Sequence, residues 1–268
     1  MGSSIAQLVA QNGFEVIQFD INEQTLFKSR ASIQNNLQKL VDKEKISSEQ
    51  KEHFFSRITF TATIDKCIAD IIIEAVAENK EIKQQLFDRL FSINGEATIF
   101  ATNTSSISVA GLSRNKEYAS CFAGMHFFNP PTIMKLVEII RTAETSEEVI
   151  TTLVELAKCF GKTPVVCNDA PGFIVNRVAR HYYLEALQLL EENAATVETI
   201  DAIMEASGFK MGPFKLMDLI GLDVNYSVSN IVWEALGNPQ RLKPSVVQKK
   251  KVDANKLGRK TSQGFYKY

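Results

Sequence analysis

The order of apolar segments predicts an α/β protein with a doubly wound, mostly parallel sheet, followed by a second domain that is all helical. Up to about residue 168, short apolar runs typical of strands alternate with segments of helical periodicity. Beyond that point the spacing is helical, and no strand-like alternation of useful length occurs before the last few residues. We therefore expect two domains, residues 1–168 and residues 169–268.

The N-terminal segment predicts a helix, a tight turn at Asn12-Gly13 and a short strand that finishes on Asp20. This order is the second half of a dinucleotide-binding βαβ unit, in which the terminal acid hydrogen-bonds the adenosine ribose. We expect the first strand and most of the glycine-rich turn to be absent, with Gly2 in the place of the third glycine. Alternatively, Asp20 is the N-cap of a helix that starts near Glu23.

The middle of the first domain contains apolar runs at residues 58–60, 69–76 and 97–102, with a helix predicted from about Lys80 to Phe91. Continuous apolar runs suit parallel strands that are covered on both faces. Two polar clusters follow such strands, at residues 77–79 and 103–106, which places them at the sheet edge where doubly wound proteins bind ligands. For Ser105 in the second cluster, a structural role as the cap of the following turn stays open.

The stretch from Gly124 to Glu138 holds the most informative polar residues. His126, one of three histidines, ends an apolar run, and Glu138 lies inside a second one, on the same strand face as Leu136 and Ile140. A buried carboxylate is costly without a partner, and an oriented imidazole commonly moves protons near neutral pH. We expect His126 and Glu138 to pair, although a lone histidine beside aromatic residues is more often structural.

Composition excludes several functional classes. The chain has 268 residues and a formal net charge of −1, which gives no electrostatic reason to expect nucleic acid or an anionic membrane as a partner. No apolar run is long enough to span a membrane. The four cysteines show neither a C-x-x-C pair nor a metal-like grouping, so we predict no metal site and a reducing, cytoplasmic compartment.

The second domain is expected to begin with a helix capped by Asp169, with Pro171 in its first turn. A long helix spans about residues 173–192 and includes Asn176, an unfavourable residue for a helix, and His181, for which we expect a packing role. Further helix boundaries are marked by Thr196, Gly208, Pro213 and Gly237-Asn238-Pro239. The richly apolar helices predict a homodimer formed through this domain.

Taken together, the motifs resemble the L-3-hydroxyacyl-CoA dehydrogenases, and the length resembles the short monofunctional form known as 3-hydroxybutyryl-CoA dehydrogenase. The similarity follows the order of that family along nearly the whole chain. It is carried by the Gly124–Glu138 stretch and by Asn103-Thr104-Ser105-Ser106, Pro171-Gly172-Phe173-Ile174-Val175-Asn176-Arg177, Met211-Gly212-Pro213-Phe214, Gly258-Arg259-Lys260-Thr261 and Gly264-Phe265-Tyr266.

The resemblance implies a catalytic set in which His126 takes the proton of the substrate 3-hydroxyl as hydride leaves for NAD. Glu138 would orient the imidazole, and Ser105 and Asn176 would bind the reacting oxygen, one from each domain. The remaining implied contacts are Gly2, Asp20, Glu78, Lys83 and Asn103 to the cofactor, and Asn129 and Lys43 to the acyl-CoA substrate. An acid at residue 20 favours NAD over NADP.

These residues imply NAD-dependent oxidation of short-chain L-3-hydroxyacyl-CoA, and the reverse reaction, in fatty acid or butanoate metabolism. Two alternatives stay open. The first alternative is a binding or structural protein without turnover, which the absence of the first strand suggests. The second is a dehydrogenase of free hydroxy acids.

Overall fold

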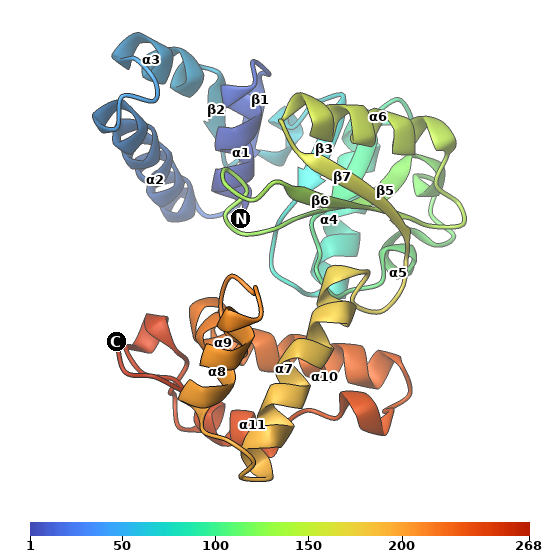
Figure 1. Ribbon diagram of the computed structural model, residues 1–268. Coiled ribbons are helices and arrows are strands. Elements are labelled where there is room, and N and C mark those ends of the chain that lie inside the picture. The colour runs from blue at the N-terminus through green and yellow to red at the C-terminus, as the bar shows by residue number, and fades with distance from the viewer. The chain divides into compact units, whose positions relative to one another are not determined.

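A computed structural model describes all 268 residues, which form two compact units, Met1–Asp169 and Ala170–Tyr268 (Figure 1). The predicted α/β class of the first part and the helical character of the second are confirmed. Unit 1 contains seven strands, and their bounds are β1 Val16–Phe19, β2 Ile58–Thr61, β3 Ile71–Glu74, β4 Ile99–Thr102, β5 Phe122–Phe127, β6 Leu136–Arg141 and β7 Thr163–Asn168. Its α-helices are α1 Gly2–Gln11, α2 Glu23–Asp42, α3 Ser48–Ser56, α4 Lys80–Asn94, α5 Val109–Ser113 and α6 Glu147–Cys159.

The strands of unit 1 form two sheets. One has five strands in the order β3-β4-β5-β6-β7, and the other contains only β1 and β2. Neighbouring strands are parallel except β5 and β6, which are antiparallel. The interruption between β1 and β3 is expected for a doubly wound sheet without its first strand, because that strand lies between these two positions in the common strand order.

Helices cover both faces of the five-stranded sheet, with α6 on one side and α4 on the other (Figure 1). On the α4 side, Phe87 and Phe122 are fully buried and their rings meet edge to face with centroids 4.7 Å apart. Phe100 and Tyr118 join the same aromatic cluster. A smaller core, centred on Ile33 and Leu37 of α2, packs α1 and α2 against β1 and β2. This double coverage explains the continuous apolar runs in the sequence.

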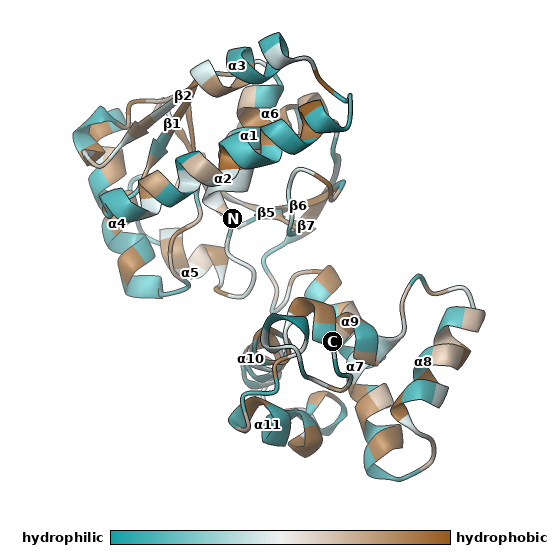
Figure 2. Ribbon diagram, turned by 90° about the vertical axis from the view of Figure 1, so that its left-hand side faces the viewer, coloured by the Kyte–Doolittle hydropathy of each residue, from teal (hydrophilic) through white to brown (hydrophobic).

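Unit 2 is helical, with α7 Val175–Glu191, α8 Val197–Ala206, α9 Pro213–Ile220, α10 Leu222–Ala235 and α11 Val246–Asp253. Several predicted boundaries are found: Thr196 caps α8 and Pro213 is the first residue of α9. The core is built around Leu187, Phe214 and Met217. Figure 2 shows brown apolar and teal polar residues on the same helices, as expected for elements with one buried face. None of the helices in the chain combines the length and apolar character needed to cross a lipid bilayer.

The prediction for Asp169 is wrong. Helix α7 begins at Val175, and its N-cap residue makes no side-chain capping hydrogen bond. The backbone is in the left-handed region at Gly172, with φ of 72°, and at Phe173, with φ of 48°, so a helix cannot run through this segment. The Asp169 carboxylate instead accepts hydrogen bonds from Ser108 Oγ at 2.7 Å and from the Ala110 N–H at 2.8 Å, at the start of α5.

Candidate active site

His126 and Glu138 lie directly opposite each other on the antiparallel strands β5 and β6. His126 Nδ1 is 2.8 Å from Glu138 Oε2, and the two side chains are 6% and 1% exposed. A carboxylate that accepts a hydrogen bond from Nδ1 favours the imidazole tautomer with its hydrogen on that nitrogen, in which Nε2 carries the acceptor lone pair. The predicted pairing of these two residues is therefore seen in the structure.

The antiparallel direction of β6 creates this pair. Only residues 128–135 separate the two strands, too few for the crossover that a parallel neighbour requires. Residues opposite each other on antiparallel strands have close Cβ atoms, so the register of Met125 with Ile139 also brings His126 onto Glu138. Burial and the negative charges of Glu138 and Asp169 raise the pKa of Cys167 to about 11.

Asn103 connects the end of β4 to β5. Its Oδ1 accepts a hydrogen bond from the Phe127 N–H at 2.8 Å, and its own N–H donates to the Glu74 carbonyl at 2.8 Å. The carbonyl half of this side chain thus holds the residue next to His126 in place. The predicted contact of Asn103 with the cofactor stays a prediction.

Glu78 organises the loop that carries Ser105. Its Oε1 accepts hydrogen bonds from the Ser105 N–H at 3.2 Å, from Ser106 Oγ at 2.9 Å and from the Thr104 hydroxyl. Burial by itself raises the pKa of Glu78, but the bonds from Thr104 and Ser106 and the charge of Lys83 outweigh it and lower the pKa below its ordinary value. Glu78 is therefore held as a carboxylate at the carboxyl end of the sheet.

Glu74 and Lys83 form a buried ion pair beneath this loop, and sequence reasoning did not single out Glu74. The Lys83 ammonium is 2.7 Å from Glu74 Oε1 and 3.2 Å from Glu78 Oε2, and its side chain is 1% exposed. The other oxygen of Glu74 accepts from the Thr102 hydroxyl at 2.7 Å. Lys83 thus contacts protein carboxylates, and its predicted contact with the cofactor stays a prediction. The available signal for Glu74 was a carboxylate closing the apolar run Ile71-Ile72-Ile73.

The residues predicted for the adenosine half also lie at strand or helix ends. Asp20 follows β1, and its Oδ1 accepts from the Asn22 N–H at 2.8 Å. The alternative role of Asp20 as an N-cap is wrong, because the Asn22 side chain caps α2. The second carboxylate oxygen of Asp20 stays available to a ribose. Gly2 opens α1, and a Cβ built there would be 3.9 Å from the Ala75 Cβ just after β3. A helix start and an acid near these strand ends fit the needs of a dinucleotide.

The remaining predicted site residues lie at the surface of unit 1 or at the start of α7. Asn129 is exposed in the segment after β5, and Lys43 is exposed at the end of α2. Asn176 belongs to unit 2, in the first turn of α7, where its carbonyl accepts a hydrogen bond from Arg180 Nε at 3.0 Å. Their roles remain predictions.

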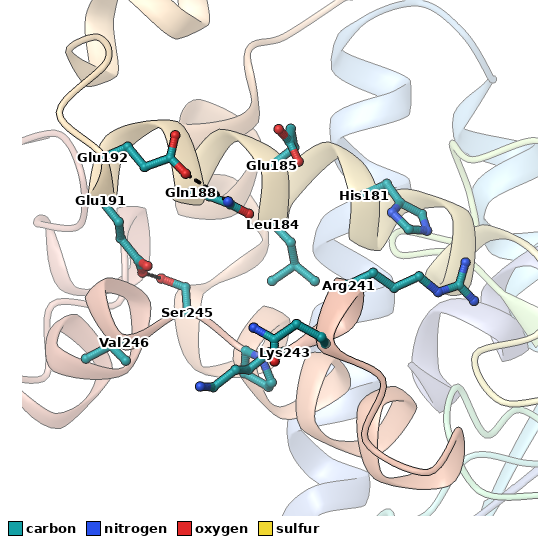
Figure 3. A pocket seen from close by; sticks show the side chains of 12 residues that line it. His181, Leu184, Glu185, Gln188, Glu191, Glu192, Arg241, Lys243, Ser245 and Val246 are labelled. Atoms are coloured by element: carbon teal, nitrogen blue, oxygen red, sulfur yellow. Dashed lines mark hydrogen bonds between the residues drawn. The ribbon is translucent and has the colours of Figure 1, made fainter.

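A pocket of about 340 Å³ lies in unit 2 between α7 and the segment that leads into α11 (Figure 3). Its lining includes acidic side chains such as Glu185 and basic side chains such as Arg241 and Lys243, together with His181. His181 is exposed here, so the packing role expected for it is wrong. None of the predicted catalytic residues lines this pocket. The chain also has no group of three or more residues that could hold a metal ion.

Comparison with known proteins adds to this geometry. Residues 1–170 match the family model of the 3-hydroxyacyl-CoA dehydrogenase NAD binding domain, and residues 172–268 match that of the C-terminal domain. The chain is 41% identical to 3-hydroxyadipyl-CoA dehydrogenase of Escherichia coli over 99% of its own length, and it spans only 56% of that protein. It is 40% identical to a probable 3-hydroxybutyryl-CoA dehydrogenase of Deinococcus radiodurans, covering all of the chain and 96% of the relative.

The fold is also shared with a solved structure. The crystal structure of 3-hydroxybutyryl-CoA dehydrogenase from Escherichia coli matches the whole chain with a TM-score of 0.97 and 40% identity, and the chain covers 57% of it. Both family models together account for nearly the full length of the chain. The chain therefore belongs to the 3-hydroxyacyl-CoA dehydrogenase family and is an NAD-dependent 3-hydroxyacyl-CoA dehydrogenase.

Proposed function

We propose that the protein oxidises short-chain L-3-hydroxyacyl-CoA, with 3-hydroxybutyryl-CoA as its simplest substrate, and catalyses the reverse reduction of 3-ketoacyl-CoA. The observation that carries this proposal is the 2.8 Å contact between His126 Nδ1 and Glu138 Oε2 on adjacent buried strands. The names of the Deinococcus relative and of the Escherichia coli structure, both 3-hydroxybutyryl-CoA dehydrogenases, support the chain length.

The proposed chemistry separates the two hydrogens of the secondary alcohol. His126 Nε2 takes the proton from the 3-hydroxyl, so that the C–O bond becomes a carbonyl as the C3 hydrogen departs with its electron pair. NAD, when bound, accepts that hydride. The Glu138 carboxylate stabilises the imidazolium through Nδ1, and Ser105 and Asn176 hydrogen-bond the reacting oxygen. In the reverse direction the imidazolium returns the proton to the oxygen.

The cofactor and the coenzyme A moiety use other residues. We propose that Asp20 and Gly2 bind the adenosine half of NAD, that Glu78 and Asn103 bind the nicotinamide half with Lys83 beneath them, and that Asn129 and Lys43 contact the acyl-CoA. The predicted setting is a cytoplasmic homodimer that acts in fatty acid or butanoate metabolism. Four free thiols agree with a reducing compartment, and exposed apolar side chains on α9 and α10, such as Leu219 and Val224, favour a dimer formed through unit 2.

The acid–base role predicts the behaviour of a single variant. In His126→Gln the side chain cannot accept and return a proton, so kcat for acetoacetyl-CoA reduction should fall by at least about 1,000-fold, while the Kd for NADH stays within about threefold. The rate is followed by NADH absorbance and Kd by fluorescence titration. His53→Gln changes an exposed histidine on α3 and serves as the matched control. Substantial turnover by His126→Gln would rule out the proposed proton transfer.

The alternative substrate class is tested by comparing acetoacetyl-CoA with acetoacetate at equal concentrations. Preference for the thioester supports the proposal, because only it carries the coenzyme A group. Preference for the free acid would instead make the protein a dehydrogenase of free hydroxy acids.

A further inference from the structure

The carboxylate of Glu74, the last residue of β3, is buried among hydrogen-bond donors. Its Oε1 accepts from the Lys83 ammonium at 2.7 Å and from the Val76 N–H at 2.6 Å. Its Oε2 accepts from the Thr102 hydroxyl at 2.7 Å. The side chain has no exposed surface, so any effect of Glu74 on a ligand has to pass through these donors.

One route from Glu74 leads through Lys83 to the loop that carries Ser105. The Lys83 ammonium lies between two carboxylates, 2.7 Å from Glu74 Oε1 and 3.2 Å from Glu78 Oε2. The other oxygen of Glu78 accepts hydrogen bonds from the Ser105 N–H at 3.2 Å and from Ser106 Oγ at 2.9 Å. Glu74 therefore fixes the ammonium that in turn holds the acceptor of the Ser105 backbone.

A second route leads through Thr102 to the start of the same loop. The Thr102 hydroxyl donates to Glu74 and accepts a hydrogen bond from the Thr104 N–H at 3.2 Å. Thr104 Oγ1 accepts from the Ile107 N–H at 3.0 Å. Thr102 is fully buried and Thr104 is 1% exposed, so water does not compete for these bonds. The two routes together connect Glu74 to residues 104–107.

Stability alone is a weak reason for this arrangement. A buried ion pair recovers little more than the cost of desolvating its charges, and apolar residues of similar volume are often equally stable. The rest of β3 is Ile71-Ile72-Ile73, and a further apolar residue at position 74 would pack but would accept no hydrogen bond from Lys83 or Thr102. The pair lies at the carboxyl ends of the parallel strands β3 and β4, the sheet edge where doubly wound proteins bind ligands.

We propose that Glu74 is a positioning residue of the dehydrogenase reaction, which acts through Lys83 and Thr102 to hold Ser105 in the geometry that binds the reacting oxygen. This inference rests on the proposed function, because it takes Ser105 as a ligand of that oxygen. A donor that is held in place before the reaction stabilises developing charge better than one that must be ordered during it. The inference adds to the proposed site a residue that contacts neither substrate nor cofactor.

A double-mutant cycle on acetoacetyl-CoA reduction tests the proposal. Glu74→Gln keeps the size of the side chain but leaves a single acceptor oxygen, so kcat should fall by about 10- to 100-fold, with KM for acetoacetyl-CoA within about threefold. Ser105→Ala should lower kcat by about 100- to 1,000-fold. The double variant should stay within about threefold of Ser105→Ala, because no Ser105 hydroxyl is left to position. Independent losses would multiply instead.

A second pair of variants cuts the other route and leaves the ion pair intact, so it tests the proposal even if Glu74→Gln does not fold. Thr102→Val removes the hydroxyl at nearly constant volume and should lower kcat as Glu74→Gln does. Thr102→Ser keeps the hydroxyl and should restore most of the activity. Glu81→Gln, an exposed glutamate in the first turn of α4, is the matched control and should keep wild-type kcat.

Hydrogen exchange followed by mass spectrometry gives a readout that does not depend on turnover. The N–H groups of residues 103–107 should exchange about tenfold faster in Glu74→Gln, whereas those of β5 should be unchanged. Equal exchange in wild type and variant, an unchanged kcat in folded Glu74→Gln, or losses that multiply with Ser105→Ala would overturn the inference while the dehydrogenase function stands. A wild type that does not reduce acetoacetyl-CoA, or a Ser105→Ala variant with wild-type kcat, would contradict the proposed function and the inference with it.

Discussion

At the residue scale, Glu138 illustrates how burial and function depend on each other. A carboxylate that is 1% exposed needs a hydrogen-bonded partner, and His126 supplies one at 2.8 Å. The same contact orients the imidazole toward one tautomer, as the acid does in a Ser-His-Asp triad. The contact that stabilises the buried carboxylate is therefore the same contact that the proposed proton transfer requires.

This dependence predicts the effect of Glu138→Gln. The variant keeps the size of the side chain but loses the negative charge that stabilises the imidazolium, so kcat should fall by about 100- to 10,000-fold, by analogy with the triad. Thermal unfolding and circular dichroism check that the fold is kept. Glu144→Gln, an exposed glutamate after β6, should keep wild-type activity. A Glu138→Gln variant with unchanged kcat would show that the carboxylate has no part in the proton transfer.

The sequence was informative for these residues for a physical reason. A titratable group inside an apolar run stands out because its burial is costly, so His126 and Glu138 could be predicted and their pairing inferred. Arg180 on α7 is 3% exposed, but it lies in a helix of mixed polar and apolar residues, where an arginine is ordinary and nothing local indicates burial. Its hydrogen-bond partners, Asn225 and Ser229, are more than forty positions away and could not be inferred.

At the element scale, one carboxylate binds the central residues of the loop between β4 and α5. Glu78 accepts hydrogen bonds from three consecutive residues of that loop, residues 104–106. It also forms an ion pair with Lys83. Thr104 Oγ1 in turn accepts hydrogen bonds from the N–H groups of Ser106 and Ile107, so these polar bonds connect most of the loop. Ser105 therefore owes its position to a residue on the neighbouring strand connection.

The lowered pKa of Glu78 predicts a pH dependence with a definite sign. The folded state binds the proton less tightly than the unfolded state, so the stability contributed by Glu78 is full above its ordinary pKa of 4.5 and is lost as pH falls through the lower folded value. Glu78→Gln should reduce this part of the acid sensitivity. Thermal melting between about pH 3 and pH 7 measures it, with Glu81→Gln on α4 as the control. Identical pH profiles for wild type and Glu78→Gln would contradict the prediction.

Element boundaries were predictable where a local signal acts alone. Thr196 and Pro213 mark helix starts because capping and the fixed φ of proline are local effects. The signal at Asp169 and Pro171 looked equally good, but the Asp169 carboxylate binds the start of α5, about sixty residues earlier in the chain. The carboxylate therefore binds Ser108 and the Ala110 N–H and does not cap a helix in its own segment.

At the scale of the whole molecule, two sheets replace the single one that the alternation of strands and helices suggests. The pairing of β1 with β2 and of β3 with β4 follows from the parallel topology, whereas the direction of β6 depends on a short connection. The sequence indicated the strands but not this direction, because an apolar run reads the same in a parallel and in an antiparallel neighbour. That direction is what places Glu138 opposite His126.

The C-terminal segment closes the helical unit through a buried carboxylate that no local pattern indicates. Asp218 on α9 is 1% exposed, and it accepts hydrogen bonds from the N–H groups of Phe265 and Tyr266, both at 2.9 Å, and from the Tyr268 hydroxyl at 3.1 Å. The Phe265 ring also packs on Phe214, with centroids 4.7 Å apart. There is no room for a Cβ at residue 264, because it would overlap the Asp218 carboxylate.

Deleting residues 265–268 should therefore destabilise the protein well beyond the loss of four terminal residues. The truncation leaves the Asp218 carboxylate without these three donors and exposes Phe214, so the free energy of unfolding should fall by about 3–5 kcal/mol. Urea denaturation followed by circular dichroism measures this change, and Tyr268→Phe, which removes one of the three bonds, should cost only about 1 kcal/mol. Asp218→Asn in the full-length chain should lie between these values, because the amide oxygen still accepts the bonds made to one of the two carboxylate oxygens. If the truncated chain unfolds at the wild-type urea concentration, the C-terminal segment does not stabilise unit 2.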